Sequence, residues 1–166
     1  MLCAAGCAKA PAPNERAPTP SAAPLASAPS ASAAASGAGA PRWLGDGCHA
    51  GVGHEGSAAE RLRRSAEACA PGAEALGEPQ RLAASGEARF TLPRAGCLRV
   101  IAVSERADSD VALELSEAAG EVRAKDDLPG AIALAPPRGP LCLAAPGVVT
   151  AKAAGGPLLV SAWLAR

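Results

Sequence analysis

Aromatic residues are almost missing from this chain, which has no tyrosine, one phenylalanine and two tryptophans in 166 residues. Its hydrophobic core must therefore be built from leucine, valine, isoleucine and alanine. The formal net charge is zero, so the chain lacks the basic surface typical of nucleic-acid binding, and we expect no nucleic acid as a partner. No apolar run is long enough to span a bilayer, which argues against an integral membrane protein.

The string Ala4-Ala5-Gly6-Cys7 resembles a lipobox, the site at which bacterial lipoproteins are cleaved and diacylated on the cysteine. We therefore predict lipidation of Cys7 and a membrane partner through that anchor, with residues 1–7 as the remnant of a signal peptide. The basic and apolar regions of a signal peptide do not precede the motif. Two interpretations stay open: a start further upstream, or a chance match in an alanine-rich chain. Ala8 in place of aspartate resembles the outer-membrane default, so we expect an exported protein at the periplasmic or surface face of the outer membrane.

Residues 8–41 are rich in alanine, proline and serine and show no hydrophobic periodicity. Prolines disfavour helix, and large apolar side chains that would offset the entropy of ordering are scarce. We predict a disordered tether that holds a domain away from a membrane. The alternative is disordered filler with no selected length.

Residues 42–85 are predicted to form a glycine-rich loop and one short helix. Ser57 and Glu60 have the spacing of a capping box at the start of this helix. Its apolar face is formed by residues at helical spacing, namely Leu62, Ala66 and Cys69. Pro71 and Gly72 end it. The helix arginines are interpreted as a solvated surface: Arg61, Arg63 and Arg64.

From residue 86 the hydrophobic period changes to two, as expected for strands separated by turns. The expected strands are 87–92, 97–103, 110–116, 121–125, 131–135, 141–145, 147–153 and 157–164. The predicted fold class is mainly β, with an antiparallel jelly-roll-like β-sandwich over residues 86–166. A short disulfide-linked helix and a disordered N-terminal tether precede it. We expect Trp163 to pack in or beside the last strand.

Several segments within this half of the chain carry a family resemblance: 96–102, 108–115, Gly120, 140–143, 146–147 and 157–164. They resemble the bacterial pre-peptidase C-terminal-type β-sandwich. Ser109 and Val148 depart from its pattern, where the family often has an apolar and an aromatic residue. The resemblance implies a non-catalytic module that accompanies enzymes or stands alone as a binding or stabilising unit.

Removal of Cys3 and lipidation of Cys7 would leave four cysteines, an even number suited to an oxidising compartment. Four cysteines allow three connectivities. Within the frame of the resembled sandwich, the favoured pairing links the two cysteines around the helix and two cysteines on strands: Cys48 with Cys69, and Cys97 with Cys142.

Four side chains near the helix have the ligand types that zinc accepts: Cys48, His49, His54 and Cys69. Their spacing matches no common zinc module, and export favours disulfide pairing. A zinc site gains weight if the chain is cytosolic. The G-x-G-x-x-G match at residues 51–56 lacks the preceding strand that a dinucleotide site requires.

Two further candidate sites involve acids. Ser57, His54 and either Asp46 or Glu55 supply the residue types of a hydrolase, but a helix N-cap explains Ser57 better. Calcium candidates are the turn aspartates Asp108 and Asp110, with Asp126 and Asp127 as further oxygen donors. Solvated turn formers are the alternative interpretation.

We therefore expect a non-enzymatic, lipid-anchored envelope or cell-surface module with an interaction or structural role, a protein or glycan partner in the envelope and no cofactor. The second hypothesis is a carbohydrate- or calcium-binding accessory domain of an exported enzyme system. The third is a cytosolic metal-binding protein.

Overall fold

The computed structural model describes residues 47–165, so the predicted lipidation site Cys7 and the predicted tether 8–41 lie outside the described residues. The helix of the described part is α1 (Ala58–Cys69). Its strands are β1 (Glu74–Ala75), β2 (Gln80–Leu82), β3 (Ser85–Leu92), β4 (Gly96–Ser104), β5 (Ala112–Glu117), β6 (Val122–Asp126), β7 (Ile132–Ala135), β8 (Leu141–Leu143), β9 (Gly147–Ala154) and β10 (Leu158–Leu164).

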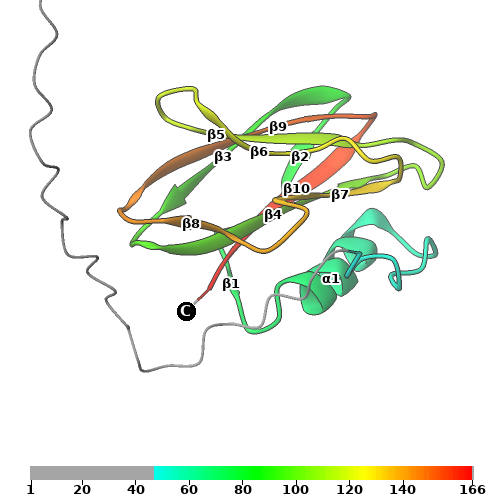
Figure 1. Cartoon of the computed structure of the whole chain (residues 1–166). Coiled ribbons are helices and arrows are strands. Elements are labelled where there is room, and N and C mark those ends of the chain that lie inside the picture. The colour runs from blue at the N-terminus through cyan, green and yellow to red at the C-terminus, as the bar shows by residue number, and fades with distance from the viewer. Residues whose placement is uncertain (1–46, 166) are drawn as a thin grey trace, which may run out of the picture. The chain divides into compact units, whose positions relative to one another are not determined.

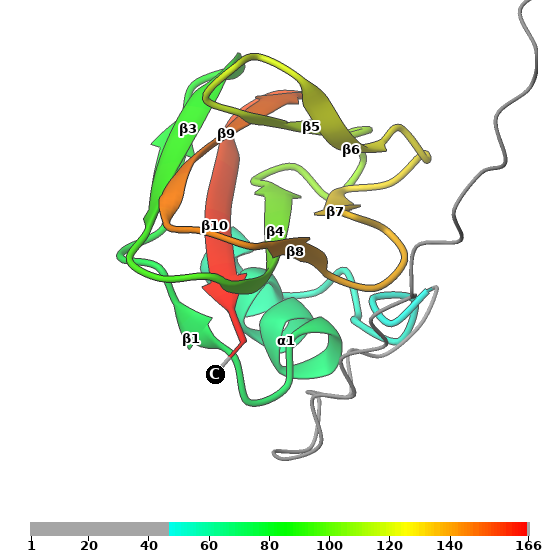
Figure 2. The same ribbon diagram turned by 60° about the vertical axis from the view of Figure 1, so that its left-hand side comes forward.

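The strands form two antiparallel sheets that face each other, and α1 covers the outer face of one of them (Figures 1 and 2). The six-stranded sheet has β10 and β4 at its centre. There β1 and β2 pair with β10, while β7 and β8 pair with β4. The four-stranded sheet has the order β3-β9-β5-β6. This arrangement confirms the predicted mainly β, antiparallel sandwich with one short helix.

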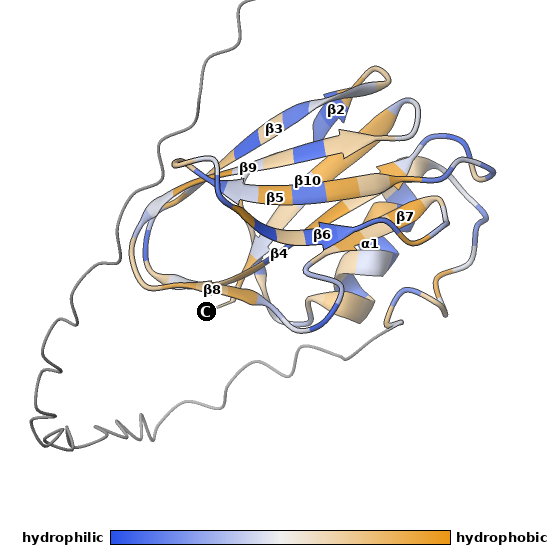
Figure 3. Cartoon of the chain, turned by 45° about the horizontal axis from the view of Figure 1, so that its top comes forward, coloured by the Kyte–Doolittle hydropathy of each residue, from blue (hydrophilic) through white to orange (hydrophobic). Residues whose placement is uncertain are grey.

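The burial patterns of the strands follow from these layers. In β3 and β9 of the four-stranded sheet, buried and exposed residues alternate, because one face meets the core and the other meets solvent. In β4 and β10 nearly every residue is buried, because α1 covers the second face of the six-stranded sheet. Figure 3 shows the same contrast, with hydrophobic colour concentrated in β7 and β10 and alternating colour in β3, β5 and β9.

Each face of β4 therefore faces a different apolar cluster. Leu98, Val100 and Ala102 point between the two sheets, where they pack with Phe90 and the leucines and valines of the sandwich core. Ile101 and Val103 point the other way, toward α1. The outer cluster is completed by residues of the helix and neighbouring strands: Val52, Ala58, Leu62, Ala66, Cys69, Ile132, Leu134 and Leu159. Trp163, half-buried on β10, packs against this outer cluster.

The helix begins with the capping box expected from the sequence. The backbone N–H of Glu60 donates to Ser57 Oγ at 3.3 Å, and the backbone N–H of Ser57 donates to Glu60 Oε2 at 2.7 Å. Gly56 just before this cap has φ +88°, and a Cβ there would lie 2.7 Å from Glu60 Oε2. Glycine at this position thus makes room for the carboxylate that folds back over the helix start.

Both predicted disulfides are present. Cys48 pairs with Cys69, which links the loop before α1 to the last residue of that helix. Cys97 pairs with Cys142, which links opposite residues of the neighbouring strands β4 and β8. This second bridge therefore joins two strands of the six-stranded sheet and not the two sheets to each other.

The structure also differs from the sequence expectations at two places. The eight expected strands occur with shifted ends, but β1 and β2 were not expected, and they add the segment after the helix to the sandwich. The prediction that Arg61 belongs to a solvated surface is wrong, because only 1% of the residue's surface is exposed.

Within residues 47–165 no helix has the length and apolar character needed to cross a bilayer.

Candidate functional site

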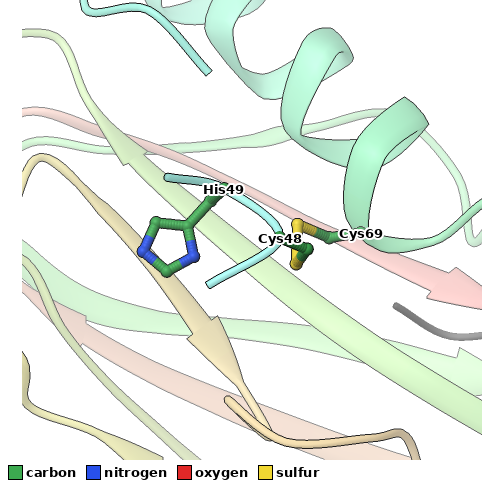
Figure 4. Close-up of side chains that lie close together, drawn as sticks. All are labelled: Cys48, His49 and Cys69. Atoms are coloured by element: carbon green, nitrogen blue, oxygen red, sulfur yellow. A yellow bond between two sulfur atoms is a disulfide. The ribbon is translucent and has the colours of Figure 1, made fainter. Parts of the chain in front are cut away.

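The side chains best suited to chemistry lie together where the loop before α1, the end of α1 and β4 meet. A turn over residues 47–52 is closed by hydrogen bonds from the Ala50 N–H to Gly47 O and from the Val52 N–H to His49 O, each 2.8 Å. This turn places Cys48 against Cys69, with a distance of 5.3 Å between their Cα atoms. Figure 4 shows the disulfide and the imidazole of His49 beside it.

A buried arginine completes this cluster. Arg99 of β4 is fully buried, and its Nη1 donates to the carbonyl oxygen of Cys69 at 2.7 Å and lies 3.6 Å from Cys48 Sγ. Its Nη2 donates to the carbonyl oxygen of Gly139 at 2.8 Å. One guanidinium thus links the end of α1, the disulfide and the loop between β7 and β8. Burial lowers the pKa of Arg99, because desolvation penalises the charged form.

Cys48, His49 and Cys69 are the one group of three metal-ligand types in the part of the chain that the structure describes, with their ligand atoms within 4.8 Å of one another. Both sulfur atoms are used by the disulfide, and zinc binds the thiolate form of cysteine. The guanidinium of Arg99 also places a positive charge beside Cys48. In the oxidised state the two cysteines form a structural bridge. The imidazole of His49 is then the only ligand that this group offers to a cation.

The structure does not bring His54, the fourth member of the predicted zinc set, to the disulfide. His54 instead lies with His49 around a small cavity of about 200 Å³, which Val52 and residues 129–132 also line. The buried Nδ1 atom of His49 has no hydrogen-bond partner among the described residues.

Of the predicted hydrolase residues, Ser57 serves the helix cap. The hydroxyl of Ser57 donates to Glu60 Oε2 at 2.9 Å, and the carbonyl oxygen of Glu55 accepts a hydrogen bond from Arg64 Nη2. Asp46 lies outside the described residues. The Ser57 hydroxyl therefore has a partner that explains its position without a nucleophilic role.

The four calcium candidates each have a separate local partner. Asp108 pairs with Arg106 at 3.3 Å, which lowers the pKa of that carboxyl group, and Asp127 pairs with Lys125 at 2.9 Å, with the same effect. The remaining two accept backbone hydrogen bonds. Gly130 donates to Asp110 Oδ1 at 2.9 Å.

Asp126 is the most buried of these carboxylates, with 3% of the residue exposed. Its two oxygens accept hydrogen bonds from the backbone N–H groups of Leu128 at 3.1 Å and Leu134 at 2.8 Å. It thereby fastens the end of β6 to β7 across the gap between the two sheets. No three of the aspartates meet within the described residues.

Sequence reasoning missed both buried arginines. Arg99 interrupts the otherwise apolar stretch of β4, and a charge inside such a stretch is a signal of a buried, hydrogen-bonded group. Arg61 lies on the helix face toward β4, where its Nη2 donates to the carbonyl oxygen of Ser104 at 2.7 Å. Because Arg61 is adjacent to Leu62, its position in the helix is compatible with both the buried and the exposed face. The sequence therefore contains no clear signal that Arg61 is buried.

No family model matches the chain, and no curated protein matches it.

Proposed function

We propose that this chain is an exported, lipid-anchored bacterial protein whose folded part is a non-enzymatic module of the cell envelope, with an interaction or structural role. The observation that carries the proposal is the pairing of all four cysteines from Cys48 onward into two disulfides. Disulfides persist in oxidising compartments and are rare in the reducing cytosol. This pairing leaves Cys3 and Cys7, and of these Cys7 has the lipobox-like context that acylation requires.

The predicted tether is consistent with this role. Residues 8–41 separate Cys7 from the folded part, and 34 residues in extended polyproline II conformation span on the order of 100 Å. We infer further that the module is of the pre-peptidase C-terminal type. The antiparallel sandwich supports this, because the segments that carry the resemblance form β4, β5, β8 and β10.

Acylation is tested by expressing the protein from its own gene, with whatever leader the gene encodes, in a bacterial host. We expect wild-type protein in the membrane fraction, with a mass that shows a chain starting at acylated Cys7. The Cys7→Ser variant should leave the membrane fraction. Cys3→Ser is the matched control and should partition like wild type, because Cys3 precedes the cleavage site. Equal partitioning of wild type and Cys7→Ser would refute the anchor.

Export is tested separately on the same samples by alkylating free thiols before and after reduction. Two disulfides predict that Cys48, Cys69, Cys97 and Cys142 are blocked until reduction. Free thiols at these positions in freshly lysed cells would refute export to an oxidising compartment. They would instead support the cytosolic metal-binding hypothesis.

A second candidate, the ligand-binding accessory domain, is favoured by a cavity of about 520 Å³ at one end of the sandwich. It is lined by Glu117 and Arg123 near the β5–β6 turn and by residues 142–148, which run from the end of β8 to the start of β9. A ligand that binds the folded state raises the melting temperature. Melting curves with calcium and with a panel of oligosaccharides test this candidate, and unchanged curves throughout would remove it.

A further inference from the structure

A second large cavity lies where the described chain begins. It has a volume of about 490 Å³ and is lined by Gly47, His49, Lys125, Asp126, Asp127, Leu128, Pro136, Pro137 and Arg138. Leu128 is 62% exposed, the largest exposed fraction among the large hydrophobic residues of the described part. An apolar side chain of this size in a concave surface favours a partner that removes it from water.

Three of the four charged side chains in the wall of this cavity have partners described above; the fourth is Arg138. Lys125 pairs with Asp127 at 2.9 Å, and both oxygens of Asp126 accept backbone hydrogen bonds. The apolar surface comes from Leu128 and from two half-buried prolines, Pro136 and Pro137. The cavity therefore suits an apolar occupant better than a charged one.

The chain itself supplies such an occupant close by. Trp43 and Leu44 stand four and three residues before Gly47, the first described residue, and between Cys7 and Val52 the only other large apolar residue is Leu25. Gly47, three residues after Leu44, is itself part of the cavity wall. At ~3.3 Å per extended residue, Trp43 can reach about 13 Å from Gly47. The length of chain between them thus permits insertion into the cavity that the chain borders.

We propose that Trp43 and Leu44 dock in this cavity and fasten the end of the predicted tether to the sandwich. Tryptophan buries a large apolar surface and its indole N–H requires an acceptor when buried. The carboxylate of Asp127, exposed in the cavity wall, has lone pairs beyond its ion pair with Lys125 and offers such an acceptor. This docking would fix the orientation of the folded module at the end of its tether, whether or not Cys7 is acylated.

Trp43 is a built-in probe, because the full chain has only one other tryptophan, Trp163. In the full-length Trp163→Phe variant, all tryptophan fluorescence comes from Trp43. Docking predicts a blue-shifted emission maximum and weak acrylamide quenching, both independent of protein concentration. If Trp163→Phe does not fold, the spectrum of wild type minus that of Trp43→Phe gives the same quantity.

The cavity is tested by adding Leu128→Ser to this background. We expect the Trp43 emission to shift toward that of free indole in water and acrylamide quenching to increase several-fold. Val122→Ser is the matched control, because Val122 is 50% exposed and is not part of the cavity wall. Circular dichroism confirms that each variant is folded.

Three outcomes would overturn the proposal. Trp43 emission like that of free indole in the folded Trp163→Phe protein would show that nothing covers the side chain. Equal effects of Leu128→Ser and Val122→Ser would place Trp43 elsewhere. Protection that disappears on dilution would show that a second copy of the chain, and not the same chain, occupies the cavity.

Discussion

Arg99 Nη1 donates a hydrogen bond of 2.7 Å to the carbonyl oxygen of Cys69, the last residue of α1. The carbonyl groups of the last helical turn have no partner within the helix, and the C-terminal end of a helix favours a positive charge. Arg99 supplies both a donor and a charge from the middle of the six-stranded sheet. It thus positions the helix on the sheet from inside the interface.

We expect Arg99→Met to lower the free energy of unfolding by about 2–4 kcal/mol, because it leaves the buried carbonyl oxygen of Cys69 and the half-buried one of Gly139 without this donor. Urea unfolding measures the change. Arg63→Met on α1 is the control, since the Arg63 side chain is 64% exposed and its ion pair with Glu67 contributes little. Equal stability of the two variants would contradict the structural role of Arg99.

Removing each disulfide should destabilise the fold to a different extent. The chain-entropy estimate is about 3 kcal/mol for Cys48–Cys69, separated by 21 residues, and about 4 kcal/mol for Cys97–Cys142, separated by 45. We therefore expect the double variant Cys97→Ala/Cys142→Ala to be at least as destabilised in urea as Cys48→Ala/Cys69→Ala.

The two double variants should also differ in where hydrogen exchange increases. Loss of Cys48–Cys69 should accelerate amide exchange in the loop of residues 47–56 and in the last turn of α1, because that bridge holds the loop on the helix. Loss of Cys97–Cys142 should accelerate exchange in β8, a three-residue strand paired with β4. Uniform acceleration in both variants would show that neither bridge acts locally.

The fold was predictable because its strands and turns leave strong local patterns. Alternation in β3 and β9, turn residues between strands and the Ser57–Glu60 capping box each depend on neighbouring residues only. The strands β1 and β2 were missed because they have two and three residues. Segments so short contain no period, and their strand character comes from pairing with β10, which is distant in sequence.

The site was less predictable than the fold. The family resemblance favoured the cysteine pairing that the structure has, but the contribution of Arg99 depends on the packing of α1 against β4, which no local pattern encodes. Asp126 and Asp127 are adjacent and of one type, yet one is buried between the sheets and the other is exposed. Only the tertiary fold distinguishes them.

The capping box predicts a pH dependence. Two hydrogen bonds from Ser57 lower the pKa of Glu60 below its ordinary value of 4.5. The bond from the backbone N–H of Ser57 has the larger effect, and the bond from its hydroxyl has the smaller one. A group whose pKa is lowered on folding stabilises the folded state above its unfolded pKa, and this contribution is lost as the pH falls through the folded pKa. Wild type should therefore be more stable than Glu60→Gln above pH 4.5, and the difference should shrink below it.

Urea unfolding of wild type and Glu60→Gln across this pH range measures the effect. Glu78→Gln, in the exposed turn between β1 and β2, serves as the control. A difference between wild type and Glu60→Gln that stays constant across the range would show that the carboxylate charge does not contribute to the cap.

Asp126 should be essential for stability, although its neighbour Asp127 should not. Asp126→Ala leaves the N–H groups of Leu128 and Leu134 without their acceptor, and we expect a loss of about 2–4 kcal/mol. Asp126→Asn should lose less, because an amide keeps one acceptor oxygen in the same place. Asp127→Ala removes only an exposed ion pair with Lys125 and should change stability by about 0.5 kcal/mol or less. If Asp126→Ala and Asp127→Ala unfold at the same urea concentration, the carboxylate of Asp126 does not connect the two sheets as its hydrogen bonds indicate.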